Sequence, residues 1–222
     1  MGAVLAMMRL LGLLGLLMLA ACGNDGLSSG ALRGVWSSTF GQNAAPPNLR
    51  ESLTPEAIAR FSGPLLFVEV FGSGIQAGLT PGPRNGAVQQ WNTQDGASLS
   101  LIGGVVTASR ALGDDLISAD VSDVVAALRR GAKRGVRVHR YLTHENSLEI
   151  RAFKCDYTQA GRETAQTLAG SFAARRVDES CFDSGGLRID NSYWIDGSGV
   201  VRKSRQWLSP LVGYVLIERL KD

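Results

Sequence analysis

Few side chains in this 222-residue chain have the types and spacings that catalysis requires. Asp183 and Asp190 could form an acid–base pair for cleaving a glycan, but that mechanism depends on the separation of the two carboxylates, which a sequence does not give. Asp114 and Asp115 are adjacent, so an extended chain points their side chains in different directions. We expect them to end a turn after Gly113. Polysaccharide hydrolysis therefore stays an alternative, and we predict no catalytic residue.

The histidines and cysteines do not form a metal site by their spacing. Zinc sites place several Cys or His ligands close together in sequence, whereas His139 and His144 form no such motif. His139 lies opposite a valine face in a strand pattern, and we expect it to be solvated. Cys155 and Cys181 form an even pair, which in an exported chain predicts a disulfide. A metal pair and a reactive thiol are the alternatives. We predict no metal and no cofactor.

A third cysteine, Cys22, stands at the end of the most apolar segment. Arg9 and an uncharged run from Leu10 to Ala21 precede it, which is the layout of a secretory signal peptide. The sequence LAAC at 19–22 has the form of a bacterial lipobox, in which the cysteine thiol accepts a diacylglycerol, the chain is cut before it and the new amine is acylated too. Two or more acyl chains hold a protein on a membrane. An ordinary signal peptide and a membrane-spanning segment are the alternatives.

The lipobox defines the organisation of the chain. Residues 1–21 are the predicted signal peptide, residues 22–33 the lipidated cysteine and a Gly-, Ser- and Asn-rich tether, and residues 34–222 a single β-rich domain. Gly23 rather than Asp follows the anchor, which favours the outer membrane over inner-membrane retention. We therefore expect a protein anchored by lipid in the outer membrane and facing the periplasm.

Composition narrows the partners of the mature chain. Cleavage leaves 222 − 21 = 201 residues, and the charge becomes (23 − 1) − 20 = +2. Such a weak charge does not indicate nucleic-acid binding. The 27 glycines suggest many turns rather than long helices.

Aromatic and cationic residues alternate near the carboxyl end. Tyr193, Trp194 and Trp207 are interspersed with Lys203 and Arg205. Sugar rings stack on aromatic faces, and guanidinium groups bind carboxylates of acidic polymers. These five residues are our candidate surface for a polymer or partner. The alternative is that the tryptophans lie in the core, with the cations on the outer face of a strand.

Most of the chain has the alternation and turn residues of short antiparallel strands. Apolar alternation predicts strands at 65–72, 87–93, 97–102, 105–110, 135–144, 147–155, 164–170 and 171–179, a hairpin over 191–210 and a closing strand at 211–220. The strands of 135–144 and 147–155 place Val136, Val138 and Leu142, and Leu148, Ile150 and Ala152, on one face each. Residues 78–86, GLTPGPRNG, are expected to form a loop.

Tight turns are expected at the Asp-Gly of 95–96, at Gly103-Gly104 and at 196–199. Two short helices are expected. One follows Thr54 as N-cap and Pro55 at the first position, and the other covers 123–133 after Asp120 or Ser122. Strands at such short spacing predict an all-β fold, an antiparallel barrel-like or strongly curved sheet with one or two short helices.

Three stretches together resemble the YjbF/GfcB/YmcC lipoproteins, a family linked to group 4 capsule and exopolysaccharide production. They are residues 90–116, the Cys155 and Cys181 pair, and residues 191–221. The resemblance implies a β-rich lipoprotein that faces the periplasm and has partners among exopolysaccharide export proteins. It implies no established catalytic residue.

We therefore expect a non-enzymatic accessory that docks export proteins and contacts polysaccharide. A lipid or lipoprotein carrier with an apolar cavity is the alternative.

Overall fold

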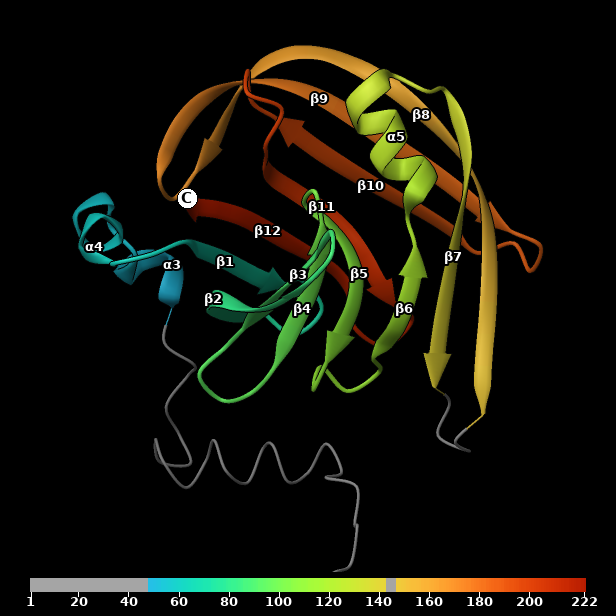
Figure 1. Ribbon diagram of the computed structural model, residues 1–222, viewed down its shortest axis with the longest axis horizontal. Coiled ribbons are helices and arrows are strands. Elements are labelled where there is room, and N and C mark those ends of the chain that lie inside the picture. The colour runs from blue at the N-terminus through green and yellow to red at the C-terminus, as the bar shows by residue number, and fades with distance from the viewer. Residues whose placement is uncertain (1–47, 143–146) are drawn as a thin grey trace, which may run out of the picture. The chain divides into compact units, whose positions relative to one another are not determined.

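The protein is described here from a computed structural model that covers residues 48–142 and 147–222 (Figure 1). The predicted signal peptide, Cys22, the tether and His144 lie outside the described residues. Within these described ranges, three short helices accompany twelve strands. The helices are α3 (Leu49–Ser52), α4 (Pro55–Arg60) and α5 (Ser122–Arg130). The strands are β1 (Leu65–Val70), β2 (Ile75–Asn85), β3 (Val88–Asn92), β4 (Ser98–Ile102), β5 (Val105–Arg110), β6 (Leu116–Asp120), β7 (Arg134–Leu142), β8 (Leu148–Thr167), β9 (Gly170–Asp183), β10 (Arg188–Ile195), β11 (Val201–Ser209) and β12 (Gly213–Lys221).

All twelve strands belong to one antiparallel sheet that curves into a nearly closed barrel. The order is β5-β4-β3-β2-β1-β12-β11-β10-β9-β8-β7-β6. The two ends of this order, β5 and β6, run side by side (Figure 1). Side chains bridge this seam: Leu116 N donates to Ser109 Oγ at 3.0 Å, and Arg110 Nη1 donates to Leu116 O at 3.3 Å. The predicted all-β, barrel-like class is confirmed, with three described helices instead of one or two.

Glycine turns set the hairpin registers, as predicted. The β4–β5 turn has Gly103 and Gly104 at φ +57° and +87°, a conformation that most residues adopt only with strain. A Cβ atom on Gly104 would also lie 2.6 Å from Cβ of Val201. The predicted turn at 196–199 closes the β10–β11 hairpin, where Asp196 N donates to Val200 O at 2.9 Å.

The loop expected at 78–86 is wrong, because these residues extend β2. The first part of β2 pairs with β1, up to Leu79, and the rest pairs only with β3. Pro81 therefore has a sheet neighbour on one side only, and its missing N–H costs no ladder bond. A register shift between Pro81 and Arg84 absorbs the remaining irregularity.

The strand expected at 164–170 is not separate either, because β8 runs on through Thr167. A register shift after Gln159 lets β8 and β9 curl together as one long hairpin. Its tip folds across the outside of the barrel, where Leu168 N donates to Glu218 Oε2 of β12 at 2.8 Å. Figure 1 shows this hairpin bending over toward the carboxyl-terminal strand.

Both predicted helices are present. Thr54 caps α4 by accepting from Ala57 N at 3.2 Å, and Pro55 is the first helical residue. Asp120 Oδ1 accepts from Ser122 N at 3.0 Å at the start of α5, which ends at Gly131 in the left-handed conformation. Val124 and Leu128 of α5 pack into the barrel core. The single turn of α3 was not predicted.

The core divides between the inside and the outside of the sheet. Two clusters fill the inside, one around Trp91, Leu116 and Tyr141 and the other around Phe153 and Tyr193. A third cluster contains Ile58 of α4 and Phe67 of β1, on the opposite side of β1 from the inner clusters. Among the helices that the structure describes, none is long and apolar enough to cross a membrane.

Strand β7 has its apolar side chains outside and its polar side chains inside, the reverse of an ordinary half-buried strand, and β8 adds further apolar side chains to the same outer side. We call the following set the β7–β9 outer face: Val136, Val138, Arg140 and Leu142 of β7, Leu148, Ile150, Ala152 and Lys154 of β8, and Phe182 of β9. Its larger apolar side chains are between 46% and 57% exposed, apart from Val138, which is half-buried. The predicted grouping of these residues on one face is confirmed. The prediction that His139 is solvated is wrong, because it is fully buried.

Candidate functional site

The interior of the barrel holds an ion pair at its centre. Arg137 Nη1 of β7 lies 3.0 Å from Glu179 Oε2 of β9, and both side chains are completely buried. The same oxygen accepts from Tyr193 Oη at 2.8 Å and from Asn191 Nδ2 at 2.7 Å. Burial alone would lower the pKa of Arg137, but the charge of Glu179 raises it above its ordinary value. Four side chains from β7, β9 and β10 therefore satisfy one another without solvent.

A chain of hydrogen bonds leads from the ion pair toward β11. Arg137 Nε donates to His139 Nε2 at 2.6 Å, and His139 Nδ1 lies 2.7 Å from Tyr141 Oη. Tyr141 Oη donates to Leu208 O at 3.0 Å. This pattern requires a neutral His139 with its proton on Nδ1. Burial and the neighbouring Arg137 lower the pKa of His139 well below its usual range, which agrees with the neutral form.

The network also holds the edge strand β5. Gln206 of β11 accepts from Val106 N at 2.9 Å and donates to Gly104 O at 2.8 Å. Arg137 Nη2 donates to Val106 O at 3.4 Å. Backbone groups of β5 that have no strand partner therefore bond to side chains from across the barrel. This arrangement stabilises a fold, and none of its groups has a path to solvent for acid–base work.

The predicted disulfide joins β8 and β9. Cys155 and Cys181 are register partners and are bonded to each other. They lie close enough to Glu179 for the three residues to surround an ion. The two sulfurs are not free thiolates, however, so the group cannot bind metal while the disulfide is intact.

The candidate surface separates into inner and outer residues. Tyr193 is fully buried, so it is removed from that surface. Trp194 is half-buried on the outer side, where its indole donates to Glu163 and Lys203 Nζ lies 5.7 Å from its ring centroid. Arg176 lies at the same distance from that ring. Trp194 and Lys203 therefore remain together, as expected.

Arg205 and Trp207 both contact Tyr214, an aromatic residue that the sequence analysis did not include in the candidate surface. Arg205 Cζ lies 3.5 Å from the ring centroid of Tyr214, and the rings of Trp207 and Tyr214 pack edge to face at 5.1 Å. Arg205 also donates to Asp190 O, and Tyr214 Oη accepts from Asp190 N. These side chains close the space where β10 and β11 stop pairing. The register of β11 with β12 brings Tyr214 here, and it was not visible in the sequence.

Asp183 and Asp190 do not form an acid–base pair. Asp183 is paired with the buried Phe153, whereas Asp190 is paired with Ser180, so the two carboxylates are on opposite faces of the sheet. Although desolvation raises the pKa of Asp183, hydrogen bonds from Leu187 N, Arg151 and Gly185 N lower it below its ordinary value. A general acid needs the opposite shift.

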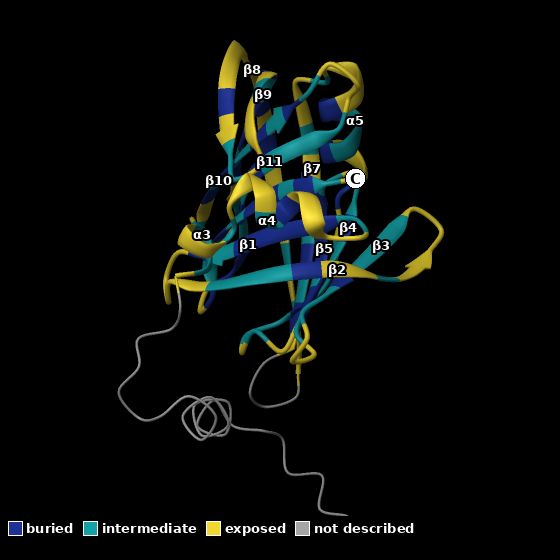
Figure 2. Cartoon of the chain, turned by 90° about the vertical axis from the view of Figure 1, so that its left-hand side faces the viewer, coloured by how far each residue is buried: buried dark blue, intermediate teal, exposed yellow. Residues whose placement is uncertain are grey.

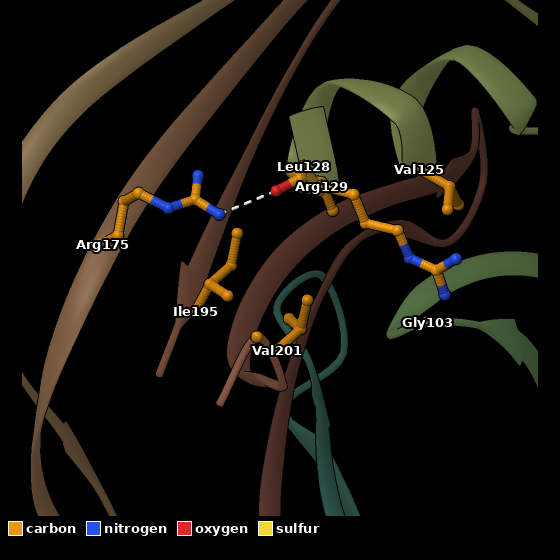
Figure 3. A pocket seen from close by; sticks show the side chains of 8 residues that line it. Gly103, Val125, Leu128, Arg129, Arg175, Ile195 and Val201 are labelled. Carbon is orange, nitrogen blue, oxygen red and sulfur yellow. Dashed lines mark hydrogen bonds between the residues drawn. The ribbon is translucent and has the colours of Figure 1, made fainter. Parts of the chain in front are cut away.

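Two hollows flank α5, and both are partly open. One, of about 340 Å³, is lined by Ile102, Ala119, Asp120, Val121, Ser122 and Val125. The other, of about 170 Å³, is lined by Gly103, Val125, Leu128, Arg129, Arg175, Ile195, Gly199 and Val201 (Figure 3). Arg175 Nη2 donates to Leu128 O at 2.7 Å and so ties β9 to α5.

Comparison with known proteins identifies the family. The model described as "Group 4 capsule polysaccharide lipoprotein gfcB, YjbF" matches residues 33–220. The chain belongs to this family. Its members are described as lipoproteins of capsule polysaccharide, and that description names no enzymatic activity.

A solved structure shares the fold. The hypothetical lipoprotein YmcC from Escherichia coli (K12) has a TM-score of 0.67 at 18% identity, with 81% of this chain and 98% of that chain covered. No curated protein sequence matches the chain.

Proposed function

We propose that this protein is a lipid-anchored accessory of capsule or exopolysaccharide production, held in the outer membrane by Cys22 and facing the periplasm. It works by docking proteins of the export machinery and performs no chemistry on the polymer. Membership of a capsule lipoprotein family supports the process and the anchor. The signal peptide and lipobox support the compartment.

The filled interior is the observation that favours docking over the carrier alternative. A carrier encloses its ligand in a largely apolar cavity. Here the centre of the barrel is occupied by Arg137, Glu179, His139 and Tyr193, each with hydrogen-bond partners. The hollows beside α5 are partly open, and members of the inner cluster, such as Leu128 and Ile195, form part of the lining of one of them. We infer that a barrel with this occupied centre acts through its outer surface.

Contact with polymer is a second candidate function, supported by Trp194. Its ring has Lys203 and Arg176 nearby, a combination that suits a sugar carrying a carboxylate. Trp194→Ala is expected to weaken retention of the protein on immobilised acidic polysaccharide several-fold. Phe61→Ala, which removes an exposed aromatic residue beside α4, is the matched control. Equal retention of both variants would remove polymer contact from the proposal.

A complementation experiment tests the main proposal. In a strain that lacks the gene, the wild type is expected to restore polymer output, whereas Cys22→Ser is expected to leave the membrane fraction and to restore little. Asp183→Asn with Asp190→Asn is expected to restore full output, because neither carboxylate acts on polymer. A photo-crosslinker at Phe71, which is exposed, is then expected to capture export proteins of the same gene neighbourhood. Normal output from a soluble Cys22→Ser protein would contradict the proposal.

A further inference from the structure

The β7–β9 outer face is the part of the described surface whose composition is hardest to explain in water. Strand register arranges it in four rungs: Val136 beside Lys154 and Phe182, Val138 beside Ala152, Arg140 beside Ile150, and Leu142 beside Leu148. Contiguous apolar surfaces of this kind mark sites of interaction. No described helix or strand packs on them, since the helix α5 contributes to the core on the other side of the sheet.

The inner side of the same strands explains why the pattern is inverted. Arg137, His139 and Tyr141 occupy the inward positions of β7, so the alternation forces the apolar residues outward. If the outer face met only water, polar side chains at these positions would not reduce folding stability. Packing of the folded chain therefore does not explain why these positions are aliphatic.

The charges on this face are of one sign. Its nine residues include two cations, Arg140 and Lys154, and no carboxylate. The carboxylates at its margins have partners: Asp156 pairs with Arg134 at 3.2 Å, Asp190 pairs with Arg188 at 2.9 Å, and Asp120 accepts from Ser122 and lies within electrostatic range of Arg140. Lys154 is therefore the cation that this face presents without a carboxylate partner among the described contacts. Aliphatic residues bordered by cations are the composition of surfaces that lie on anionic lipid.

A protein partner would be expected to leave a different composition. Interface hot spots are rich in Trp and Tyr, which this face lacks. A lipid leaflet has no fixed pockets that anchor side chains must fill. Dispersed Val, Leu and Ile side chains are therefore sufficient for contact with it. The apolar residues at Leu142 and Leu148, where the hairpin ends, suit shallow insertion.

The chain between the predicted anchor, Cys22, and the barrel is long enough for the outer face to meet the membrane. From Cys22 to Asn48 the chain has 26 residue steps, which span at most about 90 Å when extended. In the sheet order, β8 lies five strands from β1, a separation of about 24 Å along the sheet. The tether therefore permits the outer face to meet the membrane that holds Cys22.

We propose that the β7–β9 outer face lies on the anionic lipid leaflet in which the protein is anchored. The inference rests on the lipid anchor of the proposed function and adds an orientation to it. With β7–β9 against lipid, the outward-facing Trp194 and Lys203, which contact the curled-over end of β8, lie beside the membrane contact.

Site-specific fluorescence on the acylated protein tests this orientation. Cys155 and Cys181 are bonded to each other and Cys22 carries lipid, so a thiol-reactive, environment-sensitive dye attaches only at an introduced cysteine. Ile150→Cys reports on the face, and Phe61→Cys, beside α4, is the matched control. In vesicles of phosphatidylethanolamine and phosphatidylglycerol, the dye at 150 is expected to shift to the blue. Spin-labelled lipid tails should quench it several-fold more than the dye at 61.

Charge variants test the cation. Lys154→Glu in the Ile150→Cys chain is expected to reduce quenching several-fold, whereas Arg84→Glu on β2, an exposed cation of the far part of the sheet, is expected to leave it unchanged. Vesicles of phosphatidylcholine alone should reproduce the loss.

Flotation of the vesicles separates the two proposals. Protein that does not float contradicts the anchor. Protein that floats with equal quenching at 150 and 61 overturns the orientation alone. A blue shift at 150 that appears in detergent without lipid and grows with protein concentration would also overturn it, because a second copy would then cover the face.

Discussion

At the scale of single residues, the interior depends on one carboxylate oxygen. Glu179 Oε2 accepts from Arg137, Tyr193 and Asn191, which come from β7 and β10 on the two sides of β9. Taking two charges out of water is costly, so such a pair is weak evidence for net stability. Its partners are nevertheless fully specified, and a shift of register in either neighbouring strand would leave a buried charge alone.

Removing either partner of the pair should therefore be severe. Arg137→Met and Glu179→Gln are each expected to lower the free energy of unfolding by about 3–5 kcal/mol, because the remaining charge loses its partner. The double variant should be less destabilised than the sum of the two by about 1–3 kcal/mol. Urea unfolding with the disulfide intact measures all three.

The exposed pair of Arg134 and Asp156 provides the control for that cycle. Its side chains are 88% and 67% exposed, so the same substitutions there should show little coupling. If the buried pair coupled as weakly as the exposed one, Arg137 and Glu179 would not interact as described.

His139 makes stability depend on pH. Its pKa is lowered in the folded protein by burial and by Arg137, while the unfolded chain has the ordinary value of 6.5. The unfolded state therefore binds more protons below that pH, and folding stability falls as the solution becomes more acidic. The slope should approach about 1.4 kcal/mol per pH unit below pH 6.5. His139→Gln should remove this slope between pH 6.5 and 5, as measured by urea unfolding at each pH. An unchanged slope would mean that His139 is charged in the folded protein.

The faces of β7 illustrate the limit of sequence reasoning at this scale. Alternation correctly separated Val136, Val138 and Leu142 from Arg137, His139 and Tyr141. It could not say which set points inward, because that depends on whether partners such as Glu179, 42 residues away from Arg137, satisfy the polar set. The usual expectation that apolar residues are buried gave the wrong side for His139.

At the scale of elements, the barrel is closed by side chains where backbone pairing stops. Gln206 bonds to Val106 N of the edge strand β5 and to Gly104 O in the turn before it. Gln206→Leu would leave the buried Val106 N–H without this partner, at a cost of about 1–3 kcal/mol, and would also remove the partner of the partly buried Gly104 O. The amide of Val106 should then exchange its hydrogen much faster, as measured by NMR. Gln159→Leu, an exposed glutamine bonded to Arg175, should leave that exchange unchanged. Protection of Val106 in Gln206→Leu would show that β5 is held by other contacts.

Local chemistry determined which elements could be predicted. The glycine turn at 103–104 and the Thr54 cap depend on short-range backbone preferences, and both predictions were correct. The disulfide between Cys155 and Cys181 was predicted from the oxidising compartment of an exported chain, and it is also present. Pro81 and Pro83 instead suggested a loop, because the sequence does not reveal that this part of β2 has a neighbour on one side only. The long β8–β9 hairpin was divided for the same reason: its second half is stabilised by distant contacts such as that with Glu218.

At the scale of the whole molecule, the buried interior combines apolar clusters with one polar network, while several large apolar side chains remain exposed. Figure 2 shows how the buried and exposed residues are distributed over the strands. A lipid carrier needs a largely apolar cavity, whereas the centre of this interior holds an ion pair. The interior ion pair, the neutral His139 and the side chains that hold β5 all act to close the barrel. The members of the family are described as lipoproteins of capsule polysaccharide.

A closed barrel predicts the mass of the purified protein. Native mass spectrometry of the acylated protein, released gently from detergent, should give the mass of residues 22–222 plus the anchor's acyl groups. No additional lipid molecule should be bound stoichiometrically to the chain. The reason is that Arg137, Glu179 and Tyr193 are buried at the centre of the barrel, where an acyl chain would have to displace them. Arg137→Ala with Tyr193→Ala is the informative comparison, since it removes two large buried side chains and leaves an internal cavity. If this variant gains bound lipid while the wild type has none, the native interior is closed by packing. Stoichiometric lipid in the wild type would instead favour the carrier.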